Sequence, residues 1–596
     1  MQNAETIFKI YCVRGKRGLP LERIYRQLFN PSLYLIAYAN IYGNRGAMTK
    51  GMDGQTVDGM SLQRIERIIT KLKCESYQWT PVRRVYIPKK NGKTRPLGIP
   101  TWSDKLLQEV IRLLLESYYE PKFSDHSHGF RPQKGCHTAL RDLKHQSSKG
   151  TKWFIEGDIK GCFDNIDQSI LLEILGKDIK DNRFLRLLYN MLKAGYCEQW
   201  RYHPSYSGTP QGGIISPLLA NIYLDQLDQH VEEILKPIYN KGKSRRRNKK
   251  WYIACNRVRY HKKKGNYKEL KKWEKIRRSI PSQDPYDPDF KRLKYVRYAD
   301  DFIFSFAGSK QEAKEIKEHL RKFLKENLHL ELSQEKTLIT HAKTERAKFL
   351  GYEIHTQYSG SKLSPNGNRC VNGALAFKVP LKVIDEACKK YMKKGRPMHR
   401  PELTVNSDYE IVRQFQWHYA GLLNYYIMAH NLGAFSKLLH VMSKSLLCTL
   451  ADKHKSNIAK MWRKHKDKVE TPHGIRRCIS AIVQREGKSP LIARFGGIPM
   501  VRKPSAFIKD RVPIRRPRRT EILQRLLANK CEVCGSTEWI EVHHIHKLSN
   551  INKKGRKQLP DWAKIMITRK RKTLVVCQSC HKLIHAGKPL PRKPSG

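Results

Sequence analysis

Hydrophobic residues recur along the chain with two different periods, and each period predicts a different kind of element. A helical spacing of apolar residues predicts a helix over residues 62–73 and an amphipathic helix over about 105–118. Residues 153–159 are apolar enough for a buried strand, and residues 295–306 predict two strands joined by a tight turn. A mainly helical stretch is expected over about 380–481. The chain is therefore expected to mix helices and strands in several domains.

The hydrophobic pattern lapses in two places. From about residue 236 to residue 292 it gives way to sequence dense in Lys and Arg, and ordered patterns resume directly afterwards, so we expect an insertion within a domain. A connector rich in Gly, Pro and Arg ends in the run Arg511–Arg519, and such a segment usually marks a domain boundary.

Length and charge narrow the class of protein. With 596 residues, the chain is longer than one hydrophobic core usually serves, so we expect about three to five domains. Hydrophobic residues make up 39% of the chain, which is enough to form hydrophobic cores and excludes a wholly disordered chain. It has 116 Lys and Arg against 54 Asp and Glu, a formal net charge of +62. The usual partner of so strong a positive field is nucleic acid or an anionic membrane.

We expect neither membrane insertion nor secretion. The sequence has no uninterrupted apolar run of about 18 residues, which a spanning helix needs. Its first residues lack a basic stretch followed by an apolar segment. Ten of the 14 cysteines are scattered singly before residue 480, which is typical of a reducing compartment. The pattern favours a large intracellular protein that binds nucleic acid.

Three acidic residues stand at the ends of predicted strands. Asp300 and Asp301 occupy the turn within 295–306, and Asp158 lies near the end of the strand over 153–159. Adjacent carboxylates between apolar strands are costly unless a cation neutralises them. If the strands lie side by side, the three carboxylates could hold two Mg²⁺ ions about 3.5–4 Å apart, as in polymerases and nucleases. The alternative is an ordinary Asp-Asp turn.

The last four cysteines form two CxxC pairs, Cys531 with Cys534 and Cys577 with Cys580. Two such pairs can bind one Zn²⁺ ion in a closed, structural site. A redox role for one pair is the alternative, but no thioredoxin-like βαβ pattern surrounds either of them.

Histidines cluster beside these cysteines. His543, His544 and His546 lie between the two pairs, and His581 and His585, four residues apart, share one helix face after the second pair. A lone histidine would more often be structural. Because one zinc clamp would fold both groups together, we expect a second, open metal site here.

Seven sequence blocks resemble the ordered motifs of reverse transcriptases, in the versions encoded by mobile group II introns. The blocks are Ile87–Pro100, His128–Gly135, Gly157–Asp167, Gly208–Asn221, Tyr298–Asp301, Leu332–Thr337 and Phe349–Tyr352. The helical stretch that follows resembles the maturase, or X, region of the same proteins. The cysteine and histidine clusters resemble HNH endonucleases of the ββα-metal type.

For the polymerase, the resemblance implies a right-hand fold and a set of ligands. The Mg²⁺ ligands would be Asp158, Ile159, Asp300 and Asp301, and the three aspartates would be catalytic. The contacts to dNTP and template would come from the phosphate-binding Arg95, from Lys89 or Lys90 beside it, and from Phe163, Gln211 and Lys336. Phe163 would exclude a ribose 2′-OH, and a buried core position is its alternative.

For the C-terminal region, the resemblance implies a small ββα-metal domain clamped by the four-cysteine zinc site. The ligands of Mg²⁺ or a similar divalent ion would be His543, His581 and His585. His544 would be the general base that activates water. The asparagine of the HNH pattern has two candidates, Asn550 and Asn552, and His546 could compete as a metal ligand.

The expected fold class is therefore multidomain α+β, with reverse-transcriptase fingers and palm, an α-helical thumb and an HNH domain. The expected domains are an N-terminal extension with fingers (1–120), a palm (121–365) containing the basic insertion at about 236–292, a thumb/maturase X domain (366–481), a basic DNA-binding region (482–525) and the HNH endonuclease domain (526–596).

The function implied by the resemblance has three parts. The protein would reverse-transcribe RNA, bind its own intron RNA as a ribonucleoprotein to assist splicing, and nick one strand of a double-stranded DNA target to prime reverse transcription during homing. Its substrates would include dNTPs, no membrane would take part, and a dimer is left open. We expect a bacterial, nucleoid-associated protein of the cytoplasm, with an organelle as the alternative location.

Two other hypotheses compete with this one. A non-catalytic RNA-binding splicing factor would be favoured by loss of the active-site carboxylates, and none is missing. A reverse transcriptase of another lineage, serving defence or diversification, is disfavoured by the appended HNH module and the X-like segment.

Overall fold

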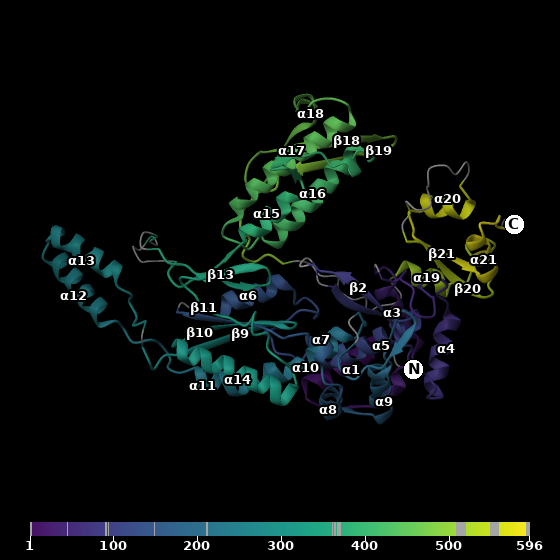
Figure 1. Ribbon diagram of the computed structural model, residues 1–596, viewed down its shortest axis with the longest axis horizontal. Coiled ribbons are helices and arrows are strands. Elements are labelled where there is room, and N and C mark those ends of the chain that lie inside the picture. The colour runs from purple at the N-terminus through teal and green to yellow at the C-terminus, as the bar shows by residue number, and fades with distance from the viewer. Residues whose placement is uncertain are drawn as a thin grey trace.

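The computed structural model describes residues 3–44, 46–89, 92, 94–147, 150–209, 212–285, 287–359, 362, 365, 371–507, 520–546, 548 and 559–591, and only the backbone of residue 488. Along the chain these residues form a helical N-terminal region, a five-stranded central sheet, a projecting pair of helices, a second helical region with its own sheet, and a small C-terminal domain (Figure 1). None of the described helices combines the length and apolarity that crossing a membrane would need.

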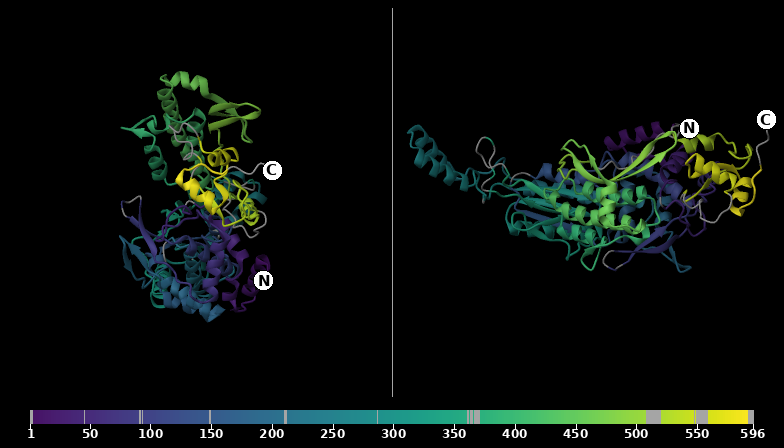
Figure 2. Two further views of the ribbon diagram at one scale, coloured as in Figure 1. Left: turned by 90° about the vertical axis from the view of Figure 1, so that its right-hand side faces the viewer. Right: turned by 90° about the horizontal axis from the view of Figure 1, so that it is seen from above.

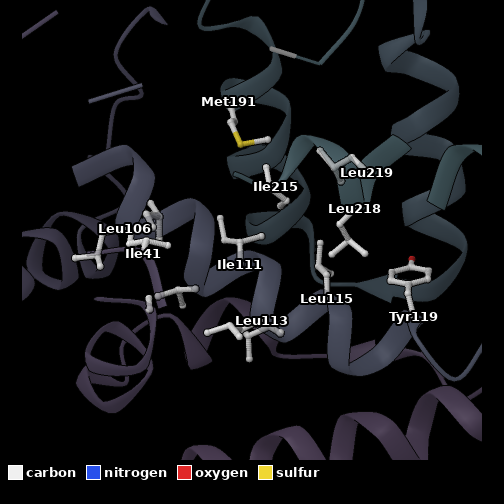
Figure 3. Packing of buried hydrophobic residues seen from close by; sticks show 14 of the residues in the cluster. Ile41, Leu106, Ile111, Leu113, Leu115, Tyr119, Met191, Ile215, Leu218 and Leu219 are labelled. Atoms are coloured by element: carbon white, nitrogen blue, oxygen red, sulfur yellow. The ribbon is translucent and has the colours of Figure 1, made fainter. Parts of the chain in front are cut away.

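The N-terminal region is organised around helix α5 (Trp102–Tyr119), of whose 18 residues 16 are buried. The predicted helix over 105–118 is confirmed, but the exposed polar face expected of an amphipathic helix is wrong, because its polar residues, such as Gln108 and Glu116, are buried as well. Figure 3 shows its apolar residues packed among those of neighbouring helices. Arg112 is satisfied there by two carboxylates of the same helix, Glu109 and Glu116. The helices packed on it are α1 (Ala4–Lys16), α3 (Pro31–Ile41), α4 (Leu62–Lys73) and α10 (Ser216–His230).

A four-stranded sheet of order β3-β2-β7-β8 lies in the same region. Its strands are β2 (Val82–Pro88), β3 (Thr94–Ile99), β7 (Tyr196–Glu198) and β8 (Arg201–His203). The antiparallel β2–β3 pair places Arg95 opposite Ile87. Smaller elements complete the region: β1 (Leu21–Glu22), paired with β6 (Ile179–Lys180), and the helices α2 (Ile24–Gln27), α8 (Gln168–Asp178) and α9 (Asn182–Lys193).

The central sheet has the order β11-β5-β10-β9-β4. Its strands are β4 (Ser127–His128), β5 (Trp153–Asp158), β9 (Arg292–Tyr298), β10 (Asp301–Ala307) and β11 (Ile339–His341). Alternate residues of β9 and β10 enter two different cores: Tyr295 and Phe302 pack with α10 and α14 (Lys310–Leu328), whereas Val296 and Ile303 pack with α6 (Cys136–Gln146). Both predicted strand regions, 153–159 and 295–306, are confirmed, and each strand is buried on two faces.

The predicted basic insertion takes the form of a helical hairpin. Helix α10 runs on through a π-helical turn (Val231–Leu235) into α11 (Lys236–Tyr239), and then α12 (Lys249–Lys263) and α13 (Tyr267–Ser279) pack on each other. Each of the two paired helices carries six Lys or Arg, and the pair has only two Glu. The hairpin extends away from the rest of the molecule (Figures 1 and 2). With this charge and projection it presents a solvated cationic surface.

The region after the central sheet begins with three short strands, β12 (Ala347–Phe349), β13 (Tyr352–Thr356) and β14 (Leu375–Lys378). Four main helices follow: α15 (Leu381–Lys389), α16 (Asp408–Tyr425), α17 (Phe435–Lys453) and α18 (Ile458–His465). A two-stranded ribbon lies between the first two, β15 (Met392–Lys393) with β16 (Arg396–Pro397). These helices stand above the central sheet (Figure 1).

The predicted helical stretch ends earlier than residue 481. From residue 466 the chain forms an antiparallel sheet of β17 (Lys466–Val469), β18 (Arg476–Arg485) and β19 (Lys488–Gly496). Basic residues stand at both ends of β18, and Phe495 of β19 packs against Phe415 and Tyr419 of α16. The expected boundary after residue 481 therefore falls inside strand β18.

The C-terminal domain contains a two-stranded sheet and a helix in ββα order: β20 (Ile540–His544), β21 (Thr573–Cys577) and α21 (Gln578–Ala586). Helices α19 (Glu521–Leu527) and α20 (Asp561–Thr568) complete it. This domain lies against the N-terminal helices α3 and α4 (Figure 1). Its apolar residues Leu523, Val542 and Val575 belong to the same continuous core as Tyr38 of α3.

Candidate functional site

Strand pairing brings the three predicted aspartates together. Antiparallel pairing of β5 with β10 sets Asp158 opposite Asp301, and Asp300 is in the β9–β10 turn, directly before Asp301. The turn is tight because Ala299 adopts the left-handed region, with φ of 55°, and its N–H donates to the carbonyl of His128. The convergence that the sequence predicts is therefore present in the fold.

The cluster is electrostatically strained without a cation. Burial, followed by repulsion from Asp300 and contact with Asp158, raises the pKa of Asp301 to about 7. Burial also raises the pKa of Asp300. Lys336 donates a hydrogen bond of 2.7 Å from Nζ to Asp158 Oδ2, and this bond raises the pKa of the lysine. Divalent cations would relieve the repulsion that remains, so the donor set fits Mg²⁺.

The backbone at Ile159 is oriented for ligation as well. The neighbouring chain pairs across it, with Ser333 N–H donating to the Asp158 carbonyl and Lys160 N–H donating to the carbonyl of Glu331. In this arrangement the Ile159 carbonyl points away from the paired segment, and among the described residues it receives no hydrogen bond. A buried carbonyl oxygen is thus available beside the three carboxylates.

A glycine permits the close packing behind Asp158. A Cβ placed on Gly157 would lie 2.0 Å from the ring of Phe302, which is its register partner on β10. Any larger residue would push the two strands apart just where the carboxylates meet.

A buried ion pair fixes the hairpin from below, and sequence reasoning missed it. Arg297 is fully buried and donates to both carboxylate oxygens of Asp228 on α10, from Nε at 2.8 Å and from Nη2 at 2.5 Å. Its Nη1 donates to the carbonyl of Ala299 at 2.9 Å, inside the turn that carries Asp300. Asn221 also accepts from Arg297. The guanidinium therefore ties the turn to α10.

The structure describes three of the other predicted nucleotide contacts, and their relation to the aspartates differs. The charge of Arg95 on β3 opposes the rise in the pKa of Asp300, so this arginine lies within electrostatic range. Phe163 is half-buried and meets Phe130 edge-on, with ring centroids 6.2 Å apart. Lys89 is exposed directly after β2. Gln211 and Lys90 lie outside the described residues.

The four cysteines of the CxxC pairs also converge. Their Sγ atoms all lie within 4.8 Å of one another, and those of Cys534 and Cys577 are 3.6 Å apart. Three of the four thiols are buried. Four sulfurs at this spacing, without disulfide bonds, fit one tetrahedral Zn²⁺ ion.

The predicted histidine ligands converge with a carboxylate from the far end of the chain. His581 Nε2 is 3.2 Å from both His543 Nδ1 and His585 Nε2. Asp58 Oδ1 lies 3.3 Å from both His543 Nδ1 and His581 Nε2, and its Oδ2 lies 2.7 Å from His585 Nε2. Although burial alone would have the opposite effect, Asp58 and Glu541 raise the pKa of His581 to about 9. The two carboxylates therefore favour positive charge at this cluster, and its four donor atoms fit a metal ion.

His544 is held by the N-terminal region. Its Nε2 is 2.8 Å from the hydroxyl of Tyr38 on α3, and burial lowers the pKa of His544 to about 3, which keeps the imidazole neutral. It borders a pocket of about 680 Å³ at the junction of the two regions. His546 lines that pocket and is not among the four clustered groups, and Asn550 and Asn552 lie outside the described residues.

Asp58 was not predicted, and no local signal could have found it. It stands in a loop before α4, 485 positions before His543 in the chain. Only the three-dimensional packing of the first and last domains brings the two together.

Comparison with known proteins agrees with the order of these regions. Residues 87–354 match the family described as reverse transcriptase (RNA-dependent DNA polymerase), residues 374–480 match type II intron maturase, and residues 531–581 match AI2M/AI1M-like, HNH endonuclease.

Two curated relatives and one solved structure show the extent of the similarity. Group II intron-encoded protein LtrA of Lactococcus lactis subsp. cremoris is 41% identical over 595 residues, covering 95% of this chain and 96% of the relative. The putative COX1/OXI3 intron 1 protein of Saccharomyces cerevisiae is 32% identical, covering 94% of this chain and 68% of that protein. A telomerase structure from Candida albicans has a TM-score of 0.36 and 13% identity over 65% of this chain and 58% of its own, too little for any argument.

Proposed function

Because the chain belongs to the group II intron-encoded proteins and carries their reverse transcriptase, maturase and HNH endonuclease domains, we propose which of its residues perform each activity. The protein is an RNA-directed DNA polymerase and a DNA endonuclease that serves in intron splicing and homing. The observation that carries the residue assignments is the formation of two separate donor clusters, one of carboxylates and one of histidines.

For the polymerase, we assign catalysis to Asp158, Asp300 and Asp301, with the Ile159 carbonyl as a further ligand of Mg²⁺. When bound, the Mg²⁺ ions would neutralise the triphosphate and favour in-line attack of the primer 3′-OH. Lys336 balances the charge of Asp158 from one side. The convergence of all three carboxylates weighs against a non-catalytic splicing factor.

Around these carboxylates we place the nucleotide contacts. Arg95 would bind the triphosphate, because a planar guanidinium matches phosphate oxygens. Lys89 and Gln211 would line the same nucleotide path, and Phe163, half-buried beside it, would exclude a ribose 2′-OH.

For the endonuclease, we assign metal binding to the three clustered histidines and the base role to His544. The metal, Mg²⁺ or a similar divalent ion, would polarise the scissile phosphate of DNA. Its histidine ligands would be His543, His581 and His585. His544 would take a proton from the attacking water, and it borders the pocket between the two regions. Zn²⁺ at the four cysteines would hold the segment between α19 and β20 to β21 and α21.

The basic surfaces would bind nucleic acids. We propose that the α12–α13 hairpin and the thumb grip the intron RNA through its phosphates. The connector Arg511–Arg519, which lies outside the described residues, would contact double-stranded DNA. We place the end of the thumb/maturase domain at Gly496 rather than at residue 481, because β18 and β19 form one sheet. The bacterial relative supports a bacterial, cytoplasmic site of action.

Two variants test the separation of the sites. Asp300→Asn is expected to abolish primer extension while leaving RNA binding and splicing nearly intact, and loss of splicing would contradict separate roles. His544→Ala is expected to abolish DNA nicking without changing primer extension on an RNA template. His546→Ala, a change of the same kind beside the same pocket, should keep both activities. Equal loss of nicking and primer extension in His544→Ala would refute the two-site assignment.

A further inference from the structure

We infer that Asp58 is the fourth protein ligand of the nuclease metal, so that the nuclease site is a composite of the N-terminal region and the HNH domain. The inference rests on the proposed role of His543, His581 and His585 and extends it. Nothing in the described part of the HNH domain supplies this carboxylate, since Asp58 belongs to the loop that precedes α4.

The distances within the cluster match the edges of a metal coordination polyhedron. With metal–nitrogen bonds of about 2.0–2.1 Å, neighbouring ligands of a tetrahedral ion lie about 3.3 Å apart. Asp58 Oδ1 is 3.3 Å from His543 Nδ1 and 3.3 Å from His581 Nε2. The nitrogen–nitrogen distances from His581 are both 3.2 Å. The carboxylate is therefore placed to bind the same metal ion as the imidazoles directly, and not only to hydrogen-bond one of the imidazole rings.

The orientation of His581 also points to a shared centre. Its Nδ1 lies 2.7 Å from Glu541 Oε2 on one side of the ring, so that Nε2, on the other side, faces the cluster. There Nε2 meets the nitrogens of His543 and His585 and the carboxylate of Asp58. Four electron-rich atoms turned toward one point repel one another unless a cation or added protons lie between them.

The loop that carries Asp58 is built into the nuclease sheet. Gly59 N–H donates to the carbonyl of Val542, and Val542 N–H donates to the carbonyl of Met60, so that residues 59–60 form an isolated antiparallel bridge with β20. The backbone N–H of His544 donates to Asp58 Oδ1 at 2.6 Å. The carboxylate is thus held by backbone pairing on the nuclease side as well as by its own loop.

Four protein ligands still leave room for chemistry. An ion held at this spacing could still expand its coordination to take water or a DNA phosphate. The cluster is accessible from solvent on the side of His585, whose side chain is 58% exposed, whereas His543 and His581 are buried. Substrate would therefore approach past His585.

Metal titration of the full-length protein tests the inference. We choose Ni²⁺ as the probe because imidazole binds it well, and Asp300→Asn as the background because it weakens the polymerase carboxylates. With the four cysteines loaded with zinc, Asp58→Asn should lower the Ni²⁺ affinity at least tenfold. Asp53→Asn makes the same change in the same loop, at an exposed residue outside the cluster, and should leave the affinity unchanged. Unchanged affinity in Asp58→Asn would overturn the inference.

A second variant tests the inference through a new spectroscopic signal and not through a loss of metal affinity. Asp58→Cys places a thiolate in the proposed ligand position, so addition of Co²⁺ should produce a sulfur-to-cobalt charge-transfer band in the near ultraviolet, and Asp53→Cys should not. Absence of that band from Asp58→Cys would likewise overturn the inference. His585→Ala separates the two proposals: if it keeps full Ni²⁺ affinity, the histidine site itself is wrong. If it loses affinity while Asp58→Asn does not, only the role of Asp58 fails.

Discussion

Replacing Asp228 by asparagine tests whether the buried ion pair beneath the polymerase hairpin controls the position of the catalytic turn. Asp228 is 1% exposed and accepts hydrogen bonds from Arg297 Nε, Arg297 Nη2 and the hydroxyl of Tyr295. Asn keeps the shape but removes the charge, and one of its two acceptor positions becomes a donor. The guanidinium of Arg297 then loses the carboxylate that it hydrogen-bonds in the core, although it must still hold the Ala299 carbonyl.

The expected cost follows from the burial of both partners. Breaking a buried ion pair by removing one charge destabilises a protein by about 3–5 kcal/mol, because the remaining charge is uncompensated. For a domain of this size, each kcal/mol lowers the unfolding midpoint by about 2–4 °C. Asp228→Asn should therefore lower the midpoint by about 6–20 °C and reduce primer extension at temperatures where the wild type is stable.

Asp225→Asn is a matched control on the same helix. Asp225 is also buried, but it accepts a hydrogen bond from Gln229 and not from Arg297, and burial, followed by repulsion from Asp228, raises its pKa to about 6. A carboxyl whose folded pKa is raised destabilises the protein above that pKa, so Asn should be neutral or stabilising at a pH of about 7.5, by at most about 3 kcal/mol. Because the penalty is lost as the pH falls, this gain should shrink to about half by a pH of about 5.

Thermal unfolding and primer extension, measured together across temperature, decide between the two variants. The reasoning requires a large loss in Asp228→Asn and none in Asp225→Asn. If both variants unfold within about 2 °C of the wild type, the buried pair does not support the hairpin, and the account given for the turn is wrong. If both lose stability equally, loss of any buried charge on α10 would explain the result.

Three further predictions concern the two metal regions. Gly157→Ala should cost about 1–3 kcal/mol or more and reduce primer extension, because its methyl group would meet the ring of Phe302, and thermal unfolding would report this. Lys336→Met should slow primer extension by removing the positive charge 2.7 Å from Asp158, without changing nicking, as single-turnover assays of each activity would show. Cys577→Ser, or removal of zinc by a chelator, should unfold the C-terminal domain and abolish nicking while primer extension persists, with limited proteolysis as the measurement.

Each of these predictions has a control in the chain. Gly176→Ala, where the nearest atom to a new Cβ is 3.9 Å away, should be tolerated, and equal loss in both glycine variants would contradict the packing argument. Lys160→Met removes an exposed lysine paired with Glu331 and should leave synthesis unchanged. Cys448→Ser, which changes a cysteine outside the zinc cluster, should leave the C-terminal domain resistant to protease.

Much of the local structure could be predicted from the sequence because its causes are local. The period of apolar residues defines α4 (Leu62–Lys73) at both ends. The acidic turn between two apolar runs identifies the β9–β10 hairpin, and the CxxC spacing brings its own ligands together. In each case a few neighbouring residues determine the geometry.

Features formed between distant segments could not be predicted in this way. In the sequence Arg297 is one of many basic residues. It becomes a buried partner of Asp228 only because α10 packs against the hairpin in the fold. Asp58 reads as an ordinary loop residue until β20 pairs with the segment that follows it. The exposure of α5 was mispredicted for the same reason, since its polar face is covered by helices from elsewhere in the chain.

The packing of the last domain onto the first has a consequence for synthesis of the protein on the ribosome. Tyr38 and its partner His544 are 506 residues apart. At translation rates of about 5–20 residues per second, roughly 25–100 s pass between the emergence of the two. During that interval the face of the N-terminal region around Tyr38 and Met60 has no nuclease domain to cover it, even once the polymerase and thumb have been synthesised. The nascent chain thus exposes an apolar surface on a strongly basic protein, and an RNA that binds early would meet a polymerase whose N-terminal region is still uncovered.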